Sequence, residues 1–359
     1  MVERVGVALV ALAILATGLS CGEPGRRQDS WEAMGSPVEV DVRTRTLADA
    51  DEAIERIRQR IDEASVDLDP ESSAGALGAI NRGAGAGFHP IENGDVYRCL
   101  QLALDYARES NGAYDPSLGA LRRLLERPVP ARSTEIEPAL SRVGWQKVIL
   151  APEAHAIRFR AIGLQLDLGM VARGCGLDWA ARTFARPGSL AGLLRFDGAY
   201  RVWGAPAGEK SWEVALEDPR RSGAELLRLR VTNRGIGVAG RPSDPTSQPG
   251  ARLFLDSESG LPAGTNLLVA VALADSAADA AALAHALYVA GSLGGPNFLA
   301  RTRRTEAILL VRRDGDRPYL LASGSLEGTI TPSPALESET AGDLRYLLPP
   351  QSLTVDKRD

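Results

Sequence analysis

The segment over residues 162–178 constrains the fold most strongly. In it an alternating apolar stretch ends in a carboxylate, and a glycine turn and a predicted helix follow. Every second residue of 162–168 is apolar, which predicts a strand, and Asp167 lies at its end. Gly169 follows, and the next residues predict a helix over 172–185. A helix that starts this way presents free backbone N–H groups and the positive end of its dipole. The segment is therefore typical of a phosphate-binding site, or of a tight strand-to-helix connection that binds nothing.

Length and composition favour one large domain. A chain of 359 residues permits two domains, but 44% hydrophobic residues are enough for a single α/β unit with a sizeable core. The formal net charge of −5 gives no basic surface, so nucleic acid is not an expected partner.

Further motifs lie along the chain, one before this segment and the others after it. They are Asn111–Ser117, Arg195–Ala199, Trp212–Pro219, Leu255–Pro262, Ala280–Leu287 and Val289–Gly291. In this order and spacing, together with the glycine turn, they resemble the FAD:protein FMN transferase family, also called the ApbE family, over about residues 34–325. The resemblance implies a single mixed α/β flavin transferase domain. It also implies transfer of the FMN half of FAD to a threonine hydroxyl of a partner protein, with release of AMP and with magnesium on the diphosphate.

The resemblance assigns FAD binding to ten residues. They are Met34, Ala113, Tyr114, Asp115, Asp167, Arg173, Asp197, Gly198, Phe254 and Leu255. Met34 is apolar and suits the face of a flavin or adenine ring. Asp115 either accepts hydrogen bonds from the ligand or stabilises the turn before Pro116. Arg173 stands where lysine is usual and keeps the positive charge, whereas Asp197 adds a side chain where glycine is usual.

The catalytic and metal positions depart from the family pattern. The family's histidine is Leu253, which cannot move a proton, so Asp256 is the candidate catalytic residue of that motif. The family's metal-binding Asp and Thr, four residues apart on one helix face, are Ala281 and His285. The candidate metal ligands are therefore His285 and the backbone carbonyl of Ala172, a set that magnesium does not favour.

Two classes of function follow from these residues. Family resemblance predicts an active FAD:protein FMN transferase. The altered metal and histidine positions favour the alternative, a catalytically impaired relative that binds flavin or serves as an interaction module.

The first 21 residues resemble a lipoprotein signal peptide. Arg4 precedes an apolar run over 5–16, which is too short to favour a membrane-spanning helix. Cys21 follows as in the lipobox of bacterial lipoproteins, although Gly18 stands where leucine is usual. We expect lipidation of Cys21 and an anchor on the periplasmic side of a bacterial membrane. Simple secretion and an uncleaved membrane anchor are the alternatives.

The two other cysteines are too few and too far apart in the sequence to indicate a disulfide framework. Cys99 has the helical spacing of a small core residue, and Cys175 takes a place where the family usually has tyrosine. Spacing alone leaves a disulfide between them open.

The remaining pattern divides the chain into a polar tether over 22–31, the domain over 32–330 and a mobile tail over 331–359. The regular elements predicted from periodicity are a strand over 38–42, a helix over 48–64, a strand over 267–274, a helix over 277–290, and a hairpin that joins 307–312 to 318–322 through Asp314 and Gly315. Two segments predict irregular structure, a loop over 69–87 and a proline-rich surface excursion over 127–137.

Overall fold

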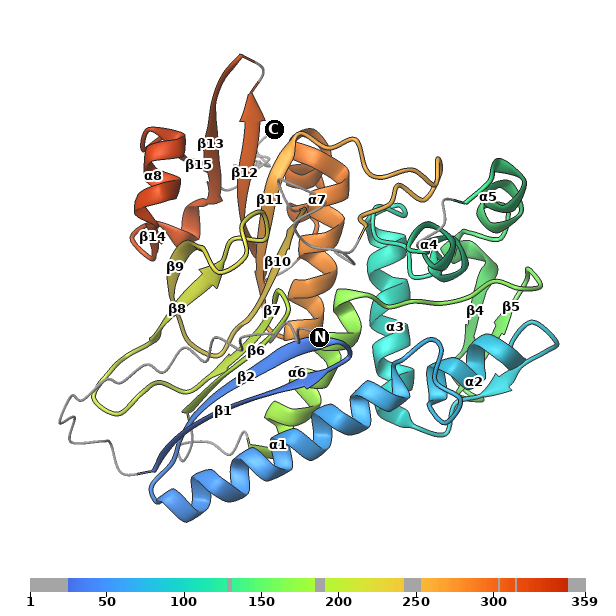
Figure 1. The fold of residues 1–359 in the computed structure, drawn as a ribbon, viewed down its shortest axis with the longest axis horizontal. Coiled ribbons are helices and arrows are strands. Elements are labelled where there is room, and N and C mark those ends of the chain that lie inside the picture. Colours follow the sequence, from blue (N-terminus) through green and yellow to red (C-terminus); the bar gives the residue numbers. More distant parts are fainter. Residues whose placement is uncertain are drawn as a thin grey trace, which may run out of the picture.

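The computed structural model describes residues 25–127, 131–184, 191–241, 253–302, 304–313 and 315–347. Within these residues a nine-stranded sheet runs through the molecule (Figure 1). Its neighbouring strands are antiparallel, except that β13 and β15 are parallel. From edge to edge the strands are β1 (Arg26–Ala33), β2 (Ser36–Arg43), β6 (Ala191–Phe196), β7 (Ala199–Trp203), β10 (Gly235–Gly240), β11 (Leu267–Ala274), β12 (Glu306–Arg313), β13 (Asp316–Ser323) and β15 (Leu344–Leu347).

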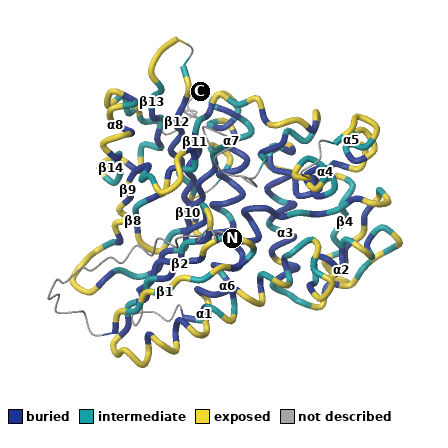
Figure 2. The backbone as a smooth tube through the Cα atoms, in the orientation of Figure 1, coloured by how far each residue is buried: buried dark blue, intermediate teal, exposed yellow. Residues whose placement is uncertain are grey.

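The centre of this sheet is buried on both faces (Figure 2). In β11, Ala270 and Ala272 belong to one apolar core, whereas Val269 and Val271 belong to a second core on the opposite face. Elements packed on both faces of a sheet explain why such a strand is apolar almost throughout.

Three helices cover one face of the sheet: α1 (Leu47–Asp67), α6 (Met170–Phe184) and α7 (Ala277–Leu299). Small residues bring α6 and α7 close together. A Cβ atom at Gly174 would lie 2.6 Å from the Cα of Ala278, so only glycine fits there. Asp178 of α6 accepts hydrogen bonds from the backbone N–H groups of Ala277 and Ala278 at 3.0 and 2.9 Å. It thereby caps the first turn of α7.

A second group of elements lies on the other side of α7, so that α7 stands between the sheet and α3 (Figure 1). The group consists of α2 (Ala76–Gly83), β3 (His89–Pro90), α3 (Gly94–Glu109), α4 (Gly119–Leu125), α5 (Ser133–Leu140), the 3-10 helix η1 (Trp145–Lys147), β4 (Val148–Ala151) and β5 (Ala156–Phe159). A disulfide joins Cys99 of α3 to Cys175 of α6 and settles the pairing that the sequence left open.

The opposite face of the large sheet carries a three-stranded sheet and a helix. These elements are β8 (Trp212–Glu217), β9 (Glu225–Val231), the 3-10 helix η2 (Gly324–Leu326), β14 (Ile330–Pro332) and α8 (Pro334–Thr340). Arg220, in the loop between β8 and β9, donates to Asp218 at 2.7 Å and to Glu339 of α8 at 2.7 Å. This buried ion-pair group fixes the loop against the C-terminal helix.

The structure confirms the mixed α/β class and most of the periodic predictions. The predicted strand over 38–42 lies within β2, the helix over 48–64 within α1 and the helix over 277–290 within α7. The predicted hairpin is β12 and β13, although Asp314 at its turn lies outside the described residues. Among the described helices, none is both long and apolar enough to span a bilayer.

The predicted tether over 22–31 is wrong from residue 26 onward. Residues Arg26–Ala33 form β1, an edge strand that pairs antiparallel with β2. Its charged side chains are held by ion pairs with α1, such as Arg27 with Asp51 at 2.6 Å. Because most side chains of β1 are polar, its sequence shows no apolar alternation and is typical of a polar linker.

The predicted tail over 331–359 is wrong up to residue 347. β14 pairs with β9, β15 pairs with β13, and Leu336 of α8 is buried in the core. These partners are distant in the sequence, so local periodicity does not reveal them. Residues 348–359, like the signal segment 1–21 with Cys21, lie outside the described residues.

Residues 162–168 do not form a ladder strand. Their extended backbone is paired by other means: the side chain of Asn81 bonds both backbone groups of Leu166 at 2.8 and 3.0 Å, and the carbonyl of Pro116 accepts from the N–H of Asp167 at 2.8 Å. Ile162 is 86% exposed, so its place in the alternation is a coincidence. The predicted loop over 69–87 contains α2, and the excursion over 127–137 contains the start of α5.

Candidate active site

A cleft of about 600 Å³ opens where the first turn of α6 meets loops from the nine-stranded sheet and from the sheet that contains β8 and β9. The β1–β2 turn, the β6–β7 turn, the β8–β9 loop and α4 complete its walls. Six of the ten residues predicted to bind FAD line it: Met34, Asp167, Arg173, Asp197, Gly198 and Phe254. Folding thus gathers motifs from both halves of the chain around one space.

Met34 lies at the tip of the β1–β2 hairpin. Met34 and Gly35 have φ values of 45° and 66°, as a two-residue turn of type I′ requires. Methionine rarely adopts this backbone conformation, and the turn keeps it because Met34 is half-buried against two of the apolar cores. The turn therefore presents a thioether at the cleft.

Asp167 supports the turn that begins α6. One carboxylate oxygen accepts from the backbone N–H of Gly169 at 2.8 Å, and the other lies 3.2 Å from Nε of Arg122. The Arg122 side chain is only 7% exposed, so this pair is part of the cleft wall. Met170 and Arg173 from the first turn of α6 both line the cleft, which places the positive end of the helix dipole beside it.

Arg173 and Asp197 form a second ion pair in the cleft. Nη2 of Arg173 lies 2.9 Å from Oδ2 of Asp197 and donates to Oγ of Ser36 at 3.0 Å. Gly198 completes the β6–β7 turn with a φ of 80°, and a Cβ atom there would lie 2.8 Å from the carbonyl oxygen of Val238.

The far wall of the cleft comes from β7 and the β8–β9 loop. Asp218 lines it, but its charge is balanced by the buried guanidinium of Arg220. The hydroxyl of Tyr200 accepts from the backbone N–H of Glu217 at 3.2 Å. Burial raises the pKa of Tyr200, which keeps this phenol neutral at physiological pH.

The residues at the family's metal positions do not fit a divalent cation. Ala281 is fully buried and offers no ligand. The ring of His285 packs edge-on against Tyr114 and Phe254, with ring centroids 5.1 and 5.0 Å apart, and is 4% exposed. Ala172 is buried in the same core. Among the residues that the structure describes, no three His, Cys, Asp or Glu side chains come together as a metal-binding group.

Three of the predicted binding residues lie behind the cleft wall. Both carboxylate oxygens of Asp115 are engaged, one by Ser117 at 2.6 and 2.8 Å and the other by the backbone N–H of Trp145 at 3.0 Å. This is the turn-stabilising role that the sequence offered as the alternative. Tyr114 donates to the carbonyl of Leu168 at 3.1 Å, and Ala113 packs against the core.

The motif around Asp256 forms a tight turn outside the cleft lining. The Asp256 carboxylate accepts from both the backbone N–H and the hydroxyl of Ser259 at 2.7 Å. Burial acts to raise the pKa of Asp256, but these hydrogen bonds outweigh it and the pKa lies below its ordinary value, which makes Asp256 a weak proton acceptor. Leu255 is buried and Leu253 packs beside it.

Several cleft residues were not predicted. Arg195, Glu217 and Asp218 lie in motifs that carried the family resemblance, so their positions were available as a signal. Arg122 and Ser36 reach the cleft through the tertiary fold alone, and no local pattern marks them.

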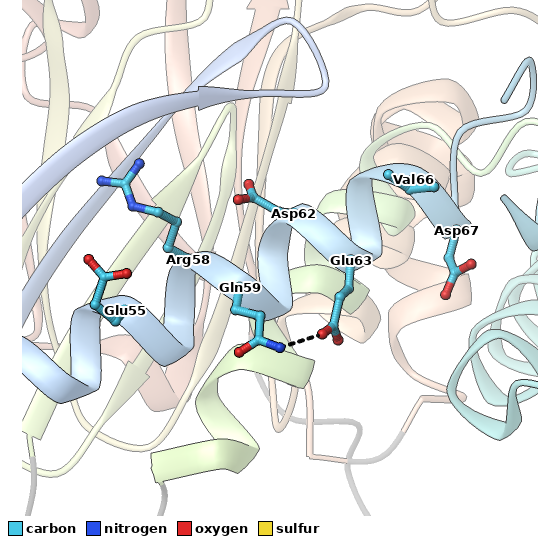
Figure 3. Close-up of a pocket in the computed structure, with 7 residues that line it drawn as sticks. All are labelled: Glu55, Arg58, Gln59, Asp62, Glu63, Val66 and Asp67. Carbon is cyan, nitrogen blue, oxygen red and sulfur yellow. Dashed lines mark hydrogen bonds between the residues drawn. The ribbon is translucent and has the colours of Figure 1, made fainter. Parts of the chain in front are cut away.

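A second surface depression lies on the outer face of α1 (Figure 3). All seven lining residues come from that one helix, and Gln59 donates to Glu63 at 3.0 Å within it. With a single helix as its wall, it lacks the converging groups from different elements that a binding site requires.

Comparison with known proteins identifies the family of the chain. The sequence profile of the ApbE family matches residues 34–309. This chain belongs to the ApbE family. The FAD:protein FMN transferase of Treponema pallidum (strain Nichols) is 27% identical over 314 residues, which cover 80% of this chain and 85% of that protein. The FAD:protein FMN transferase of Rhodobacter capsulatus is 26% identical over 322 residues, which cover 87% of this chain and 61% of that protein.

Solved structures of the family share the fold. The flavin transferase ApbE from Vibrio cholerae has a TM-score of 0.74 at 18% identity, covering 85% of this chain and 99% of that one. The ApbE protein from Thermotoga maritima has a TM-score of 0.68 at 19% identity, covering 88% of this chain and 99% of that one. The chain therefore has a single ApbE-like fold.

Proposed function

We propose that this chain is an FAD:protein FMN transferase, which moves the FMN half of FAD to a threonine of a partner protein and releases AMP. The relatives of that name support this activity, and the observation that carries it is the cleft, where the Met34 turn, the start of α6 and the Arg173–Asp197 pair converge. An apolar side chain beside buried guanidinium groups suits a ligand with an aromatic ring at one end and a diphosphate in the middle.

The transfer breaks the phosphoanhydride bond of the FAD diphosphate and forms a phosphate ester with threonine. The threonine oxygen attacks the phosphorus on the FMN side of the diphosphate, the bond from that phosphorus to the oxygen of AMP breaks, and AMP departs with the electron pair. The hydroxyl proton passes to a base or to water. Negative charge develops on the diphosphate oxygens, and it is stabilised by positive groups that are fixed in advance. In this cleft Arg173 and the N-terminal end of α6 supply such groups.

The family resemblance implies magnesium, but the side chains at the two metal positions of this chain do not suit a divalent cation. Ala281 has no ligand atom and His285 is enclosed by aromatic rings. This observation favours a second candidate, a relative that binds FAD in the same cleft but transfers FMN slowly or not at all.

We further propose that the mature chain begins at Cys21 and is held by lipid on the periplasmic side of a bacterial membrane. The apolar run before Cys21 supports the anchor. The disulfide between Cys99 and Cys175 supports an oxidising compartment, because such bonds are rare in the cytosol. The acceptor is then a threonine-bearing protein exposed on the same side of the membrane.

The activity is tested with the full chain, FAD and membranes of the producing cell, by measuring AMP release and flavin fluorescence of protein bands after denaturing electrophoresis. Transfer gives both signals, and Arg173→Gln reduces them. Arg158→Gln is the matched control, because Arg158 is exposed on β5, lies outside the cleft lining and has its guanidinium over the ring of Phe88. Bound FAD without AMP identifies the second candidate. Failure to bind FAD contradicts both.

A further inference from the structure

The ion pair between Arg173 and Asp197 occupies the position where the proposed function needs a free anion-binding group. Nη2 of Arg173 contacts Oδ2 of Asp197 at 2.9 Å, and Ser36 bridges the pair by accepting from Arg173 at 3.0 Å and donating to Asp197 at 3.3 Å. All three residues line the cleft.

The two members of the pair differ sharply in burial. The Arg173 side chain is 4% exposed and lies over the ring of Phe196 at 5.5 Å, so its guanidinium is fixed by packing. The Asp197 side chain is 48% exposed and stands on a two-residue turn. The Asp197 carboxylate can therefore turn into water once another anion takes its place, whereas the Arg173 guanidinium has no comparable freedom.

A guanidinium binds a carboxylate and a phosphate through the same planar array of N–H donors. A buried guanidinium that lost its anion would be strongly destabilised, so an anion must be present in the ligand-free protein as well. Asp197 meets that need from within the chain.

We propose that the carboxylate of Asp197 competes with the ligand's diphosphate for the guanidinium of Arg173, and that binding exchanges one anion for the other. The inference rests on the proposed function, because FAD is the ligand considered. In both states the buried guanidinium keeps a negative partner. The exchange weakens FAD binding relative to a cleft without Asp197, and it needs no change in the backbone.

The test is a titration of FAD into the full chain, followed by flavin fluorescence in the presence of EDTA. Asp197→Asn keeps the size of the side chain, and asparagine tolerates the φ of 43° at this position. Removing the competing charge should tighten FAD binding about fivefold or more. Asp316→Asn is the matched control, because Asp316 also pairs with an arginine at a hairpin, outside the cleft, and should leave the affinity unchanged.

A double-variant cycle separates competition from a general charge effect. Arg173→Gln should weaken binding about tenfold or more, and in that background Asp197→Asn should give no gain. If Arg173→Gln does not fold, Arg173→Lys keeps the charge but loses the planar fork, and the gain should shrink. An equal gain with and without Arg173, or no gain in the wild-type background, overturns the proposal.

ADP provides the second probe, because it carries the diphosphate without the flavin. If ADP binding follows the same pattern while FAD binds no tighter than ADP, the anion exchange stands and flavin transfer fails. If FAD binds with the same affinity in all variants, flavin binding stands and the exchange is wrong. If neither ligand binds, both proposals are wrong.

Discussion

Loss of the disulfide between Cys99 and Cys175 should reduce the stability of the chain substantially. The two cysteines are 76 residues apart in the sequence and join α3 to α6. In the chain-entropy account, closing a loop of this length in the unfolded state raises the free energy of unfolding by about 4.5 kcal/mol at 25 °C. Both cysteines are buried, so alanine at each also leaves a small cavity. We expect Cys99→Ala with Cys175→Ala to lower the free energy of unfolding by about 2–5 kcal/mol.

The assay is equilibrium unfolding in urea, with Cys21→Ser as the parent so that only these two cysteines remain. The unfolded parent should show no free thiol before reduction and two after it. A loss of less than about 1 kcal/mol would contradict the reasoning, because it lies well below the range for a native disulfide. Two free thiols in the parent without reductant would show that the pairing itself is wrong.

Three further outcomes are expected. Cys21→Ser should move the chain from the membrane to the soluble fraction, since acyl chains provide the anchor; an unchanged fractionation pattern would exclude Cys21 as the site. Burial acts to raise the pKa of Asp95, but guanidiniums from α1, α3 and α6 outweigh it and hold the pKa below 3.8, so its stabilisation is complete above that value and is lost as the pH falls below it. Asp95→Asn should therefore reduce the loss of unfolding free energy as the pH is lowered below about 4, and the same slope in both proteins would refute this. Met34→Ala should weaken FAD binding up to about tenfold by removing apolar contact, whereas equal affinity would show that the hairpin tip does not touch the ligand.

The sequence predicts those elements whose own side chains meet the core with a regular period. The valines of β2 and the isoleucines of α1 are buried as their spacing requires, and the alanine-rich segment forms α7. The motifs also identify six residues that line one cleft in the structure. Local patterns carry this information because burial repeats every second residue in a strand and every three to four in a helix.

Elements stabilised by distant partners are missed for the same reason. β1 is missed for a different reason: its partner β2 is adjacent in the chain, but most side chains of β1 are polar, so no apolar period marks the strand. The segment before α6 has its backbone paired by the side chain of Asn81, which replaces a neighbouring strand. In the site, the Asp115 carboxylate was predicted to accept hydrogen bonds from the ligand. Its two oxygens instead accept hydrogen bonds from Ser117 and Trp145.

The most direct test of the account is a crystal structure of the chain with FAD bound. We expect the diphosphate within hydrogen-bond distance of the Arg173 guanidinium at the start of α6, an FAD ring against Met34, and the Asp197 carboxylate turned toward solvent. FAD bound away from this cleft, or a diphosphate in the cleft with Arg173 still paired to Asp197, would contradict it.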